Sequence, residues 1–187
     1  IIVYSLGNNN SRIGLLFMVD TIDGSSATAP LTVEAGGGDD TVTGGTGDDT
    51  IDGGGGADII TGGEGNDVID LGSDASGGPD GEVDTVVIAD GDGKDKLTNF
   101  KKPTDNGDGT YSGNDQLDVS GLTDGGGNPV TTDDVAVTEV DGKAVLTFPN
   151  GETITLEDIG AADVNSPAAL AAMGIPPAGP NYIVSGT

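Results

Sequence analysis

Residues 35–70 read, in blocks of nine, AGGGDDTVT, GGTGDDTID, GGGGADIIT and GGEGNDVID. Glycine fills the second and fourth positions of every block, Asp fills the sixth, and an aliphatic residue fills the eighth. A flexible linker rich in glycine and aspartate would not hold three residue classes in a nine-residue register through four blocks. The stretch therefore predicts a repeated structural unit, and its period is the first guide to the fold.

The residue types of the block suit a cation-binding loop followed by a short strand. Glycine at positions one, two and four allows positive φ, so the backbone can turn its carbonyl oxygens inward. Asp at position six adds a carboxylate, and together these groups offer the oxygen donors that Ca²⁺ prefers. The last three residues would form a strand with one inward aliphatic side chain. Two blocks would complete one coil, so Asp40 would lie near Asp58, and Asp49 near Asp67, with calcium between the stacked loops.

These four blocks resemble the RTX (repeats-in-toxin) family, also called hemolysin-type calcium-binding repeats, whose motif is G-G-x-G-x-D-x-U-x with U aliphatic. The resemblance implies an all-β protein built on a right-handed parallel β-roll that binds several Ca²⁺ ions, with flanking strand and hairpin segments that cap it. It also implies a bacterial protein that leaves the cell by type I secretion, unfolded in the low-calcium cytosol and folding outside. The candidate ligands in the four blocks are Gly36, Gly38, Asp40, Gly45, Gly47, Asp49, Gly54, Gly56, Asp58, Gly63, Gly65 and Asp67.

Degenerate copies of the block after residue 70 add three further candidate ligands. After an insertion at 72–83, Asp84 precedes another apolar run. Asp95 and Asp115 each occupy position six of a copy that keeps positions four to eight. These copies lack glycines of the full block, and a plain turn before a strand explains Asp115 equally well.

Composition supports a calcium protein and argues against several other classes. The chain has 32 Asp and Glu against 6 Lys and Arg, a formal net charge of -26, so nucleic acid is a poor partner. It has no Cys and no His, which removes disulfides, thiolate and imidazole metal sites, and the commonest general base. We therefore expect no enzyme within these residues. The longest apolar stretch, residues 13–19, is too short to span a bilayer, so we expect no membrane insertion.

The repeat region is expected to need calcium in order to fold. One buried aliphatic side chain per nine residues returns less free energy than fixing nine backbone units costs. Stacked carboxylates add repulsion when no cation is present, whereas a cation that binds the folded state stabilises it by mass action. We predict that the region is largely unfolded without calcium.

We expect four segments along the chain: an N-terminal strand or cap segment at 1–34, the calcium-binding roll at 35–100, a degenerate repeat and hairpin cap at 101–160, and an Ala/Pro-rich short helix and tail at 161–187. Residues 32–34 read as the strand of a coil before the first block. The apolar runs at 1–4 and 13–19 favour a cap over that coil, and the alternative is a strand that pairs with another molecule.

Turn signals organise the C-terminal part. Asp141-Gly142 between two β-prone runs predicts a hairpin, and Asn150-Gly151 predicts a second turn into a strand at 152–156. Ser166 as N-cap, followed by Pro and later by Gly174, predicts a short helix. The aspartates of residues 105–109 lack the ligand spacing of an EF-hand and indicate a turn.

Two functions remain open from sequence. The first is a secreted or cell-surface calcium-dependent module with a structural, adhesive or filament and matrix role, in which terminal strands could assemble copies of the chain. The alternative is the calcium-dependent folding and secretion module of a larger secreted enzyme or toxin. Residues 115–159 and the following Ala/Pro linker also resemble segments upstream of intein-like autoprocessing domains. The chain starts at Ile1 rather than Met, so we expect a fragment or a processed product.

Overall fold

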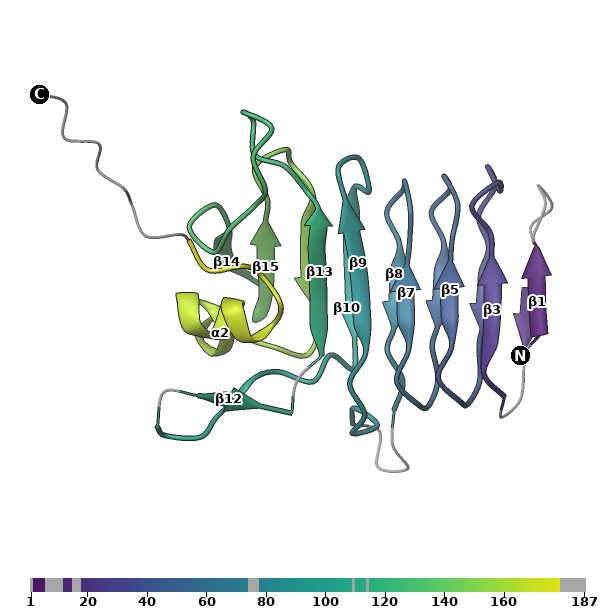
Figure 1. Ribbon diagram of the computed structural model, residues 1–187, viewed down its shortest axis with the longest axis horizontal. Coiled ribbons are helices and arrows are strands. Elements are labelled where there is room, and N and C mark those ends of the chain that lie inside the picture. The colour runs from purple at the N-terminus through teal and green to yellow at the C-terminus, as the bar shows by residue number, and fades with distance from the viewer. Residues whose placement is uncertain are drawn as a thin grey trace, which may run out of the picture.

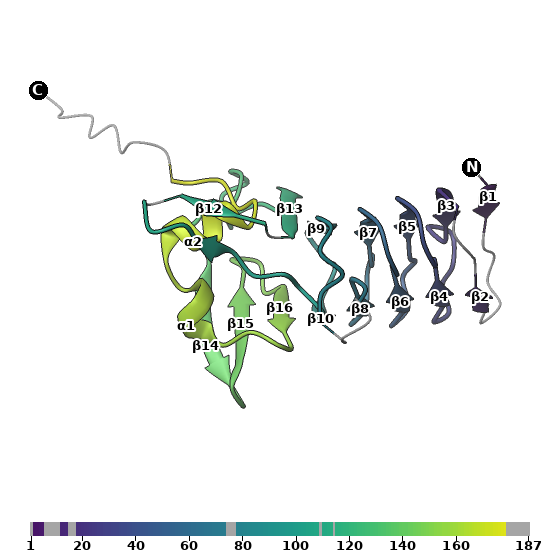
Figure 2. The same cartoon turned by 90° about the horizontal axis from the view of Figure 1, so that it is seen from below.

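The computed structural model describes residues 2–5, 12–14, 18–73, 78–108, 110–113 and 115–178. Two sheets of mostly parallel strands face each other, and through the repeats the chain passes from one sheet to the other after every short strand (Figures 1 and 2). The first sheet contains, in spatial order, β1 (Ile2–Ser5), β3 (Asp20–Asp23), β5 (Thr41–Thr43), β7 (Ile59–Thr61), β9 (Thr85–Ala89) and β13 (Gln116–Gly121). The predicted all-β fold and parallel β-roll are confirmed.

The second sheet faces the first and extends further at its C-terminal end (Figure 2). Its spatial order is β14 (Ala136–Val140), β15 (Lys143–Thr147), β16 (Thr153–Leu156), β10 (Lys94–Thr98), β8 (Val68–Asp70), β6 (Thr50–Asp52), β4 (Thr32–Glu34) and β2 (Arg12–Gly14). Odd- and even-numbered strands thus separate into two layers from β1 to β10, which is the arrangement of a two-sided coil.

The strand register follows from the nine-residue block. Val42 in β5 pairs with Ile60 in β7, and Ile51 in β6 pairs with Ile69 in β8. Each partner is one coil, or two blocks, further along the chain, as predicted. Because successive side chains of a strand point to opposite faces, only the middle residue of each three-residue strand points inward. These four aliphatic side chains are at most 1% exposed and form the apolar layer between the sheets.

The N-terminal strands extend the stack. β1 pairs in parallel with β3, and β2 pairs in parallel with β4, so both continue the two sheets by a further coil. The sequence favours a cap over the first coil, and this prediction is wrong for β1 and β2, because their pairing places them within the roll, at its outer edge. Strand β4 confirms the predicted coil before the first block, since Thr32 pairs with Thr50. Ile1 and residues 15–17 of the apolar runs lie outside the described residues.

A hairpin and two helices lie at the other end (Figure 1). β14 and β15 pair in antiparallel fashion around Asp141 and Gly142, which both have positive φ, as a two-residue hairpin turn requires. β15 then pairs with β16, and β16 runs parallel to β10 of the roll. The predicted turn at Asn150-Gly151 is confirmed, because the Gly151 N–H donates to the Phe148 carbonyl. We call residues 130–175 the cap.

The helices complete the apolar core of the cap. α2 (Pro167–Ala172) begins as predicted, with the Ser166 side chain accepting from the Ala169 N–H at 3.0 Å. The one-turn helix α1 (Ala161–Val164) was not predicted. Between roll and cap, β11 (Thr104–Asp105) and β12 (Tyr111–Ser112) form a small antiparallel hairpin. Asp105 ends β11, and Asp108 lies in the connection between the two strands, in agreement with the predicted turn.

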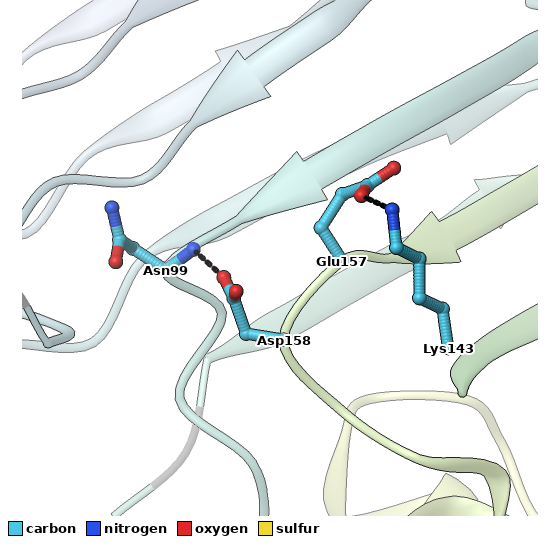
Figure 3. Close-up of polar contacts among 4 residues, drawn as sticks. All are labelled: Asn99, Lys143, Glu157 and Asp158. Atoms are coloured by element: carbon cyan, nitrogen blue, oxygen red, sulfur yellow. Dashed lines mark hydrogen bonds and ion pairs between the residues drawn. The ribbon is translucent and has the colours of Figure 1, made fainter. Parts of the chain in front are cut away.

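Hydrogen bonds join the cap to the last full coil of the roll. The Asn99 N–H donates to Asp158 Oδ2 at 3.1 Å (Figure 3). The side-chain amide of Asn99 donates to Asp70 Oδ1 at 2.7 Å. Asn99 has φ of 59°, a conformation that Asn tolerates better than most residues. Within the cap, Lys143 forms an ion pair with Glu157 (Figure 3). Asn99 thus connects a repeat strand to the cap through both its backbone and its side chain.

Candidate calcium sites

The position-six aspartates line up in two stacks, one on each side of the roll. The first stack lies near the start of the strands of the first sheet and contains Asp20, Asp40, Asp58, Asp84 and Asp115. The second stack lies near the start of the strands of the second sheet and contains Asp49, Asp67 and Asp95. In each stack, an aspartate N–H donates to Oδ1 of the aspartate one coil later. The bond from Asp40 to Asp58 and the bond from Asp49 to Asp67 are both 2.8 Å, which confirms the stacking predicted from the period.

The second carboxylate oxygen of several stacked aspartates has no protein partner. All eight side chains are buried, and Oδ2 of Asp40, Asp58 and Asp67 is buried without a hydrogen bond. A buried carboxylate oxygen without a partner is costly unless a cation or proton neutralises it. These orphaned oxygens lie on the loops that carry the glycine pattern, so they fit the calcium ligands that the sequence predicts.

The glycines of the block serve two different needs. At positions two and four of three blocks, φ lies between 95° and 145°, a backbone conformation in which any residue with a side chain is strained. These glycines are Gly36, Gly38, Gly54, Gly56, Gly63 and Gly65. A Cβ at Gly54 would overlap the Gly36 carbonyl oxygen, so stacked loops also require glycine for close backbone approach. Our expectation of positive φ at position one was wrong at Gly44, Gly53 and Gly62. At Gly53 the missing side chain instead makes room, because a Cβ there would lie 2.6 Å from Asp58 Oδ2.

The loop of residues 44–49 differs from the other three. Gly45 and Gly47 are not among the described glycines with positive φ, which corrects the expectation for this block. Asp49 Oδ2 accepts from the Gly45 N–H at 2.8 Å and is therefore not orphaned. The reason lies in its neighbour one coil earlier, residues 24–31, which lacks the block pattern: the Thr46 N–H donates to the Ala27 carbonyl. This loop stacks on a non-repeat turn and adopts a different backbone.

Burial and like charge set the electrostatics of the stacks. Burial is the largest cause that raises the pKa of Asp58, Asp67, Asp84 and Asp95 to about 7, and neighbouring aspartates add to it. The backbone N–H donated by the previous aspartate opposes this effect without cancelling it. Near neutral pH each stack therefore holds carboxylates close to their titration point, where a divalent cation competes directly with protons.

All three degenerate copies place a buried aspartate in the stacks, and the one at Asp115 differs in the contacts of its second oxygen. Asp84 Oδ1 accepts from Asp58, and Asp95 Oδ1 accepts from Asp67, at 2.8 and 2.9 Å. Asp115 also accepts from Asp84, but its Oδ2 accepts from the Lys101 N–H at 2.7 Å. Both of its oxygens thus have backbone donors, which favours the alternative of a structural turn at this position.

Two acidic residues that the sequence reasoning missed also reach the first stack. Asp20 is 2% exposed and donates its N–H to Asp40 Oδ1. The sequence feature that could have identified Asp20 is its position two residues before the buried Ile22, as in a repeat block, although the glycines of the block are missing. Asp80 comes from the insertion at 72–83, and its Oδ2 accepts from the Gly56 N–H at 3.1 Å. No period could have located Asp80, because an insertion has no register with the repeat.

Carboxylates alone do not complete a metal site here. Across the described ranges, no three acidic side chains come together closely enough to hold an ion by themselves. A calcium ion takes six to eight oxygen ligands, so carbonyl oxygens of the glycine-rich loops and water would supply the others. The structure therefore brings together the donors that the sequence predicted, with the backbone as an essential part of each set.

Comparison with known protein families agrees with this geometry. Residues 34–74 match the RTX calcium-binding nonapeptide repeat, in four copies. This part of the chain is an RTX calcium-binding repeat region, and it forms the β-roll between β4 and β8 with the strands that flank it. No curated protein matches the chain. In the part of the chain that the structure describes, no helix is long and apolar enough to cross a membrane.

Proposed function

We propose that this protein is a secreted calcium-binding module whose roll folds when calcium binds outside the cell, and that it has a structural or adhesive role rather than a catalytic one. The observation that carries the proposal is the set of buried, partnerless Oδ2 atoms of Asp40, Asp58 and Asp67. These atoms lie on repeat loops that have no lysine or arginine in the sequence, so no cationic side chain of the loops can neutralise them.

A folding trigger follows from the same atoms. The folded roll buries stacked carboxylates that repel one another, and the unfolded chain exposes them to water and salt. A cation that binds only the folded roll shifts the equilibrium by RT ln(1 + [L]/Kd), about 2.7 kcal/mol per site at a concentration 100-fold above Kd. Several sites acting together make the calcium concentration of the surroundings decide whether the roll is folded.

A structural role is supported by the way the acids are arranged. The stacked aspartates recur at each coil and bond to the neighbouring coil, which is a scaffold arrangement rather than an acid–base pair around a cleft. The outer edges of β1 and β2 have no strand partner among the described residues. Such edges can add strands from a second copy of the chain, which would join rolls end to end.

Far-UV circular dichroism with and without calcium tests the folding trigger. We expect the β-sheet signal to be weak in chelator and to rise when millimolar calcium is added, whereas millimolar magnesium should act poorly because it prefers a small octahedral site. The same spectrum in chelator and in calcium would contradict the proposal.

Size-exclusion chromatography in calcium separates the two functions. Calcium-dependent oligomers support a filament or matrix role through the edges of β1 and β2. A compact monomer in calcium would instead favour the alternative, a folding module of a larger secreted protein.

A further inference from the structure

The second stack ends where the cap begins, and the way it ends is not a copy of the repeat. Asp95 pairs with Ile154 of β16, so an apolar residue stands where the next position-six aspartate would be. The Thr153 N–H donates to the Gly93 carbonyl at 3.0 Å. This bond places Glu152, the residue before β16, over the loop of residues 90–93, which we call the terminal loop.

Glu152 turns its carboxylate into the terminal loop. Its side chain is 6% exposed, and Oε1 accepts from the Gly91 N–H at 2.9 Å. Oε2 is buried and has no hydrogen-bond partner. It is the one glutamate oxygen among the described residues with this property, and the other three such oxygens belong to the stacked aspartates. Glu152 thus shares the feature that marks the repeat aspartates although it lies far from the repeats in sequence.

A second buried carboxylate lies beside it. Asp92, in the terminal loop, is 7% exposed, and its Oδ2 accepts from the Ala89 N–H at 2.6 Å. Burial raises the pKa of Asp92, and the nearby negative charge of Glu152 raises it further. In the described part of the chain, neither carboxylate forms an ion pair with a lysine or arginine. Two buried like charges that interact favour a positive charge between them.

We propose that Glu152 and Asp92 hold a calcium ion at the junction of roll and cap, with carbonyl oxygens of the terminal loop and water completing its ligands. The inference rests on the proposed calcium binding by the roll, but the site differs from the repeat sites because a glutamate of the cap replaces the aspartate of a following loop. The ion would fasten β16 to β10 and close the second stack. Both residues lie outside the matched repeats at 34–74.

Native mass spectrometry of the full chain in calcium counts the bound ions directly. Glu152→Gln keeps the size of the side chain and an oxygen that can accept from Gly91, but it removes the charge. We expect this variant, Asp92→Asn and the double variant each to bind one calcium ion fewer than the wild type. Glu139→Gln is the matched control, because Glu139 is an exposed glutamate of the same cap and should leave the count unchanged.

Three outcomes would overturn the site. An unchanged count in Glu152→Gln would show that a proton, rather than calcium, neutralises the pair. A loss of two ions in the double variant would mean that the residues serve separate sites. If Glu152→Gln does not fold, Asp92→Asn decides, and an unchanged count there rejects the proposal. A wild-type chain that binds no calcium would instead reject the proposed function of the whole roll.

Discussion

Asp67 in the roll and Asp124 in the turn after β13 have the same side chain in opposite surroundings. Asp67 is fully buried, its Oδ2 has no partner, and burial raises its pKa to about 7. Asp124 Oδ1 accepts from the N–H groups of Gly126 and Asn128, both at 2.8 Å, and Asn128 also donates its side-chain amide. These bonds lower the pKa of Asp124, with the side-chain bond as the largest cause. A turn of the second kind is complete by itself, whereas a repeat loop is not.

The apolar core is also smaller per strand in the roll than in the cap. Each three-residue strand of the roll contributes one inward aliphatic side chain, such as Ile60 in β7. The cap instead combines several large buried side chains from strands and helices, namely Leu146, Phe148, Ile154, Leu156, Ile159, Val164, Leu170 and Met173. Since buried apolar area is the main source of folding free energy, the cap depends less on ions than the roll does.

Removing calcium should produce the largest difference in stability between the roll and the cap. In chelator we expect amides of β5 to β8 to exchange hydrogen about 100-fold faster or more, because the roll loses the contribution of about 2.7 kcal/mol from each bound ion. Amides of the β14–β15 hairpin should keep more of their protection. Hydrogen exchange followed by mass spectrometry measures both. Equal loss in the roll and in the hairpin would show that the regions unfold as one unit.

Adding a methyl group at Gly54, in a repeat loop, should have the next largest effect on the stability of the roll. Gly54→Ala places a Cβ against the Gly36 carbonyl at a φ of 95°, so we expect it to destabilise the calcium-loaded roll by about 2–4 kcal/mol. Thermal unfolding in calcium measures this change. Gly125→Ala is the control, because a Cβ there meets nothing within 4 Å, and its effect should stay within about 0.5 kcal/mol. Equal effects of the two substitutions would contradict the close stacking of the loops.

Lowering the pH should partly replace calcium in stabilising the roll, and we expect this effect to be smaller than those of calcium removal and of Gly54→Ala. The pKa of Asp58, Asp67, Asp84 and Asp95 is about 7 in the folded, metal-free roll and close to 3.8 when the chain is unfolded. The folded roll therefore binds more protons between these values, so its stability increases as the pH falls from about 7 towards about 4.

Circular dichroism in metal-free buffer measures this dependence. The β-sheet signal should be larger at about pH 5 than at about pH 8, but smaller than the signal in calcium. A signal that decreases on acidification would show that the buried carboxylates do not control the stability of the metal-free roll.

The stacking of the repeats was predictable, because their period carries three-dimensional information. Once two blocks make one coil, residues 18 apart must stack, and the bond from Asp40 to Asp58 follows. The hairpin at Asp141-Gly142 was predictable for a similar reason, since a local turn requires particular residues. In both cases the determining interactions are close in sequence or fixed by a constant spacing.

The remaining features depend on contacts that no spacing encodes. Asp80 reaches the first stack from an insertion, and Glu152 reaches the terminal loop from the cap, 61 residues from its hydrogen-bond partner Gly91. The backbone of residues 44–49 also escaped prediction, although its sequence fits the block. Its conformation is set by the non-repeat turn at 24–31 on which it stacks, and that turn lies outside the repeat.

The bonds between stacked aspartates make each coil a condition for the next. The Asp58 carboxylate, for example, accepts from the backbone of Asp40 in the coil before it and also carries a partnerless oxygen for calcium. If the roll binds calcium as proposed, a coil that loses its ion would loosen the neighbour that its carboxylate holds, so we expect partly loaded rolls to be less stable than empty and full ones. If calcium folds the roll as we propose, this coupling predicts a threshold response to calcium, unlike the graded response of independent sites.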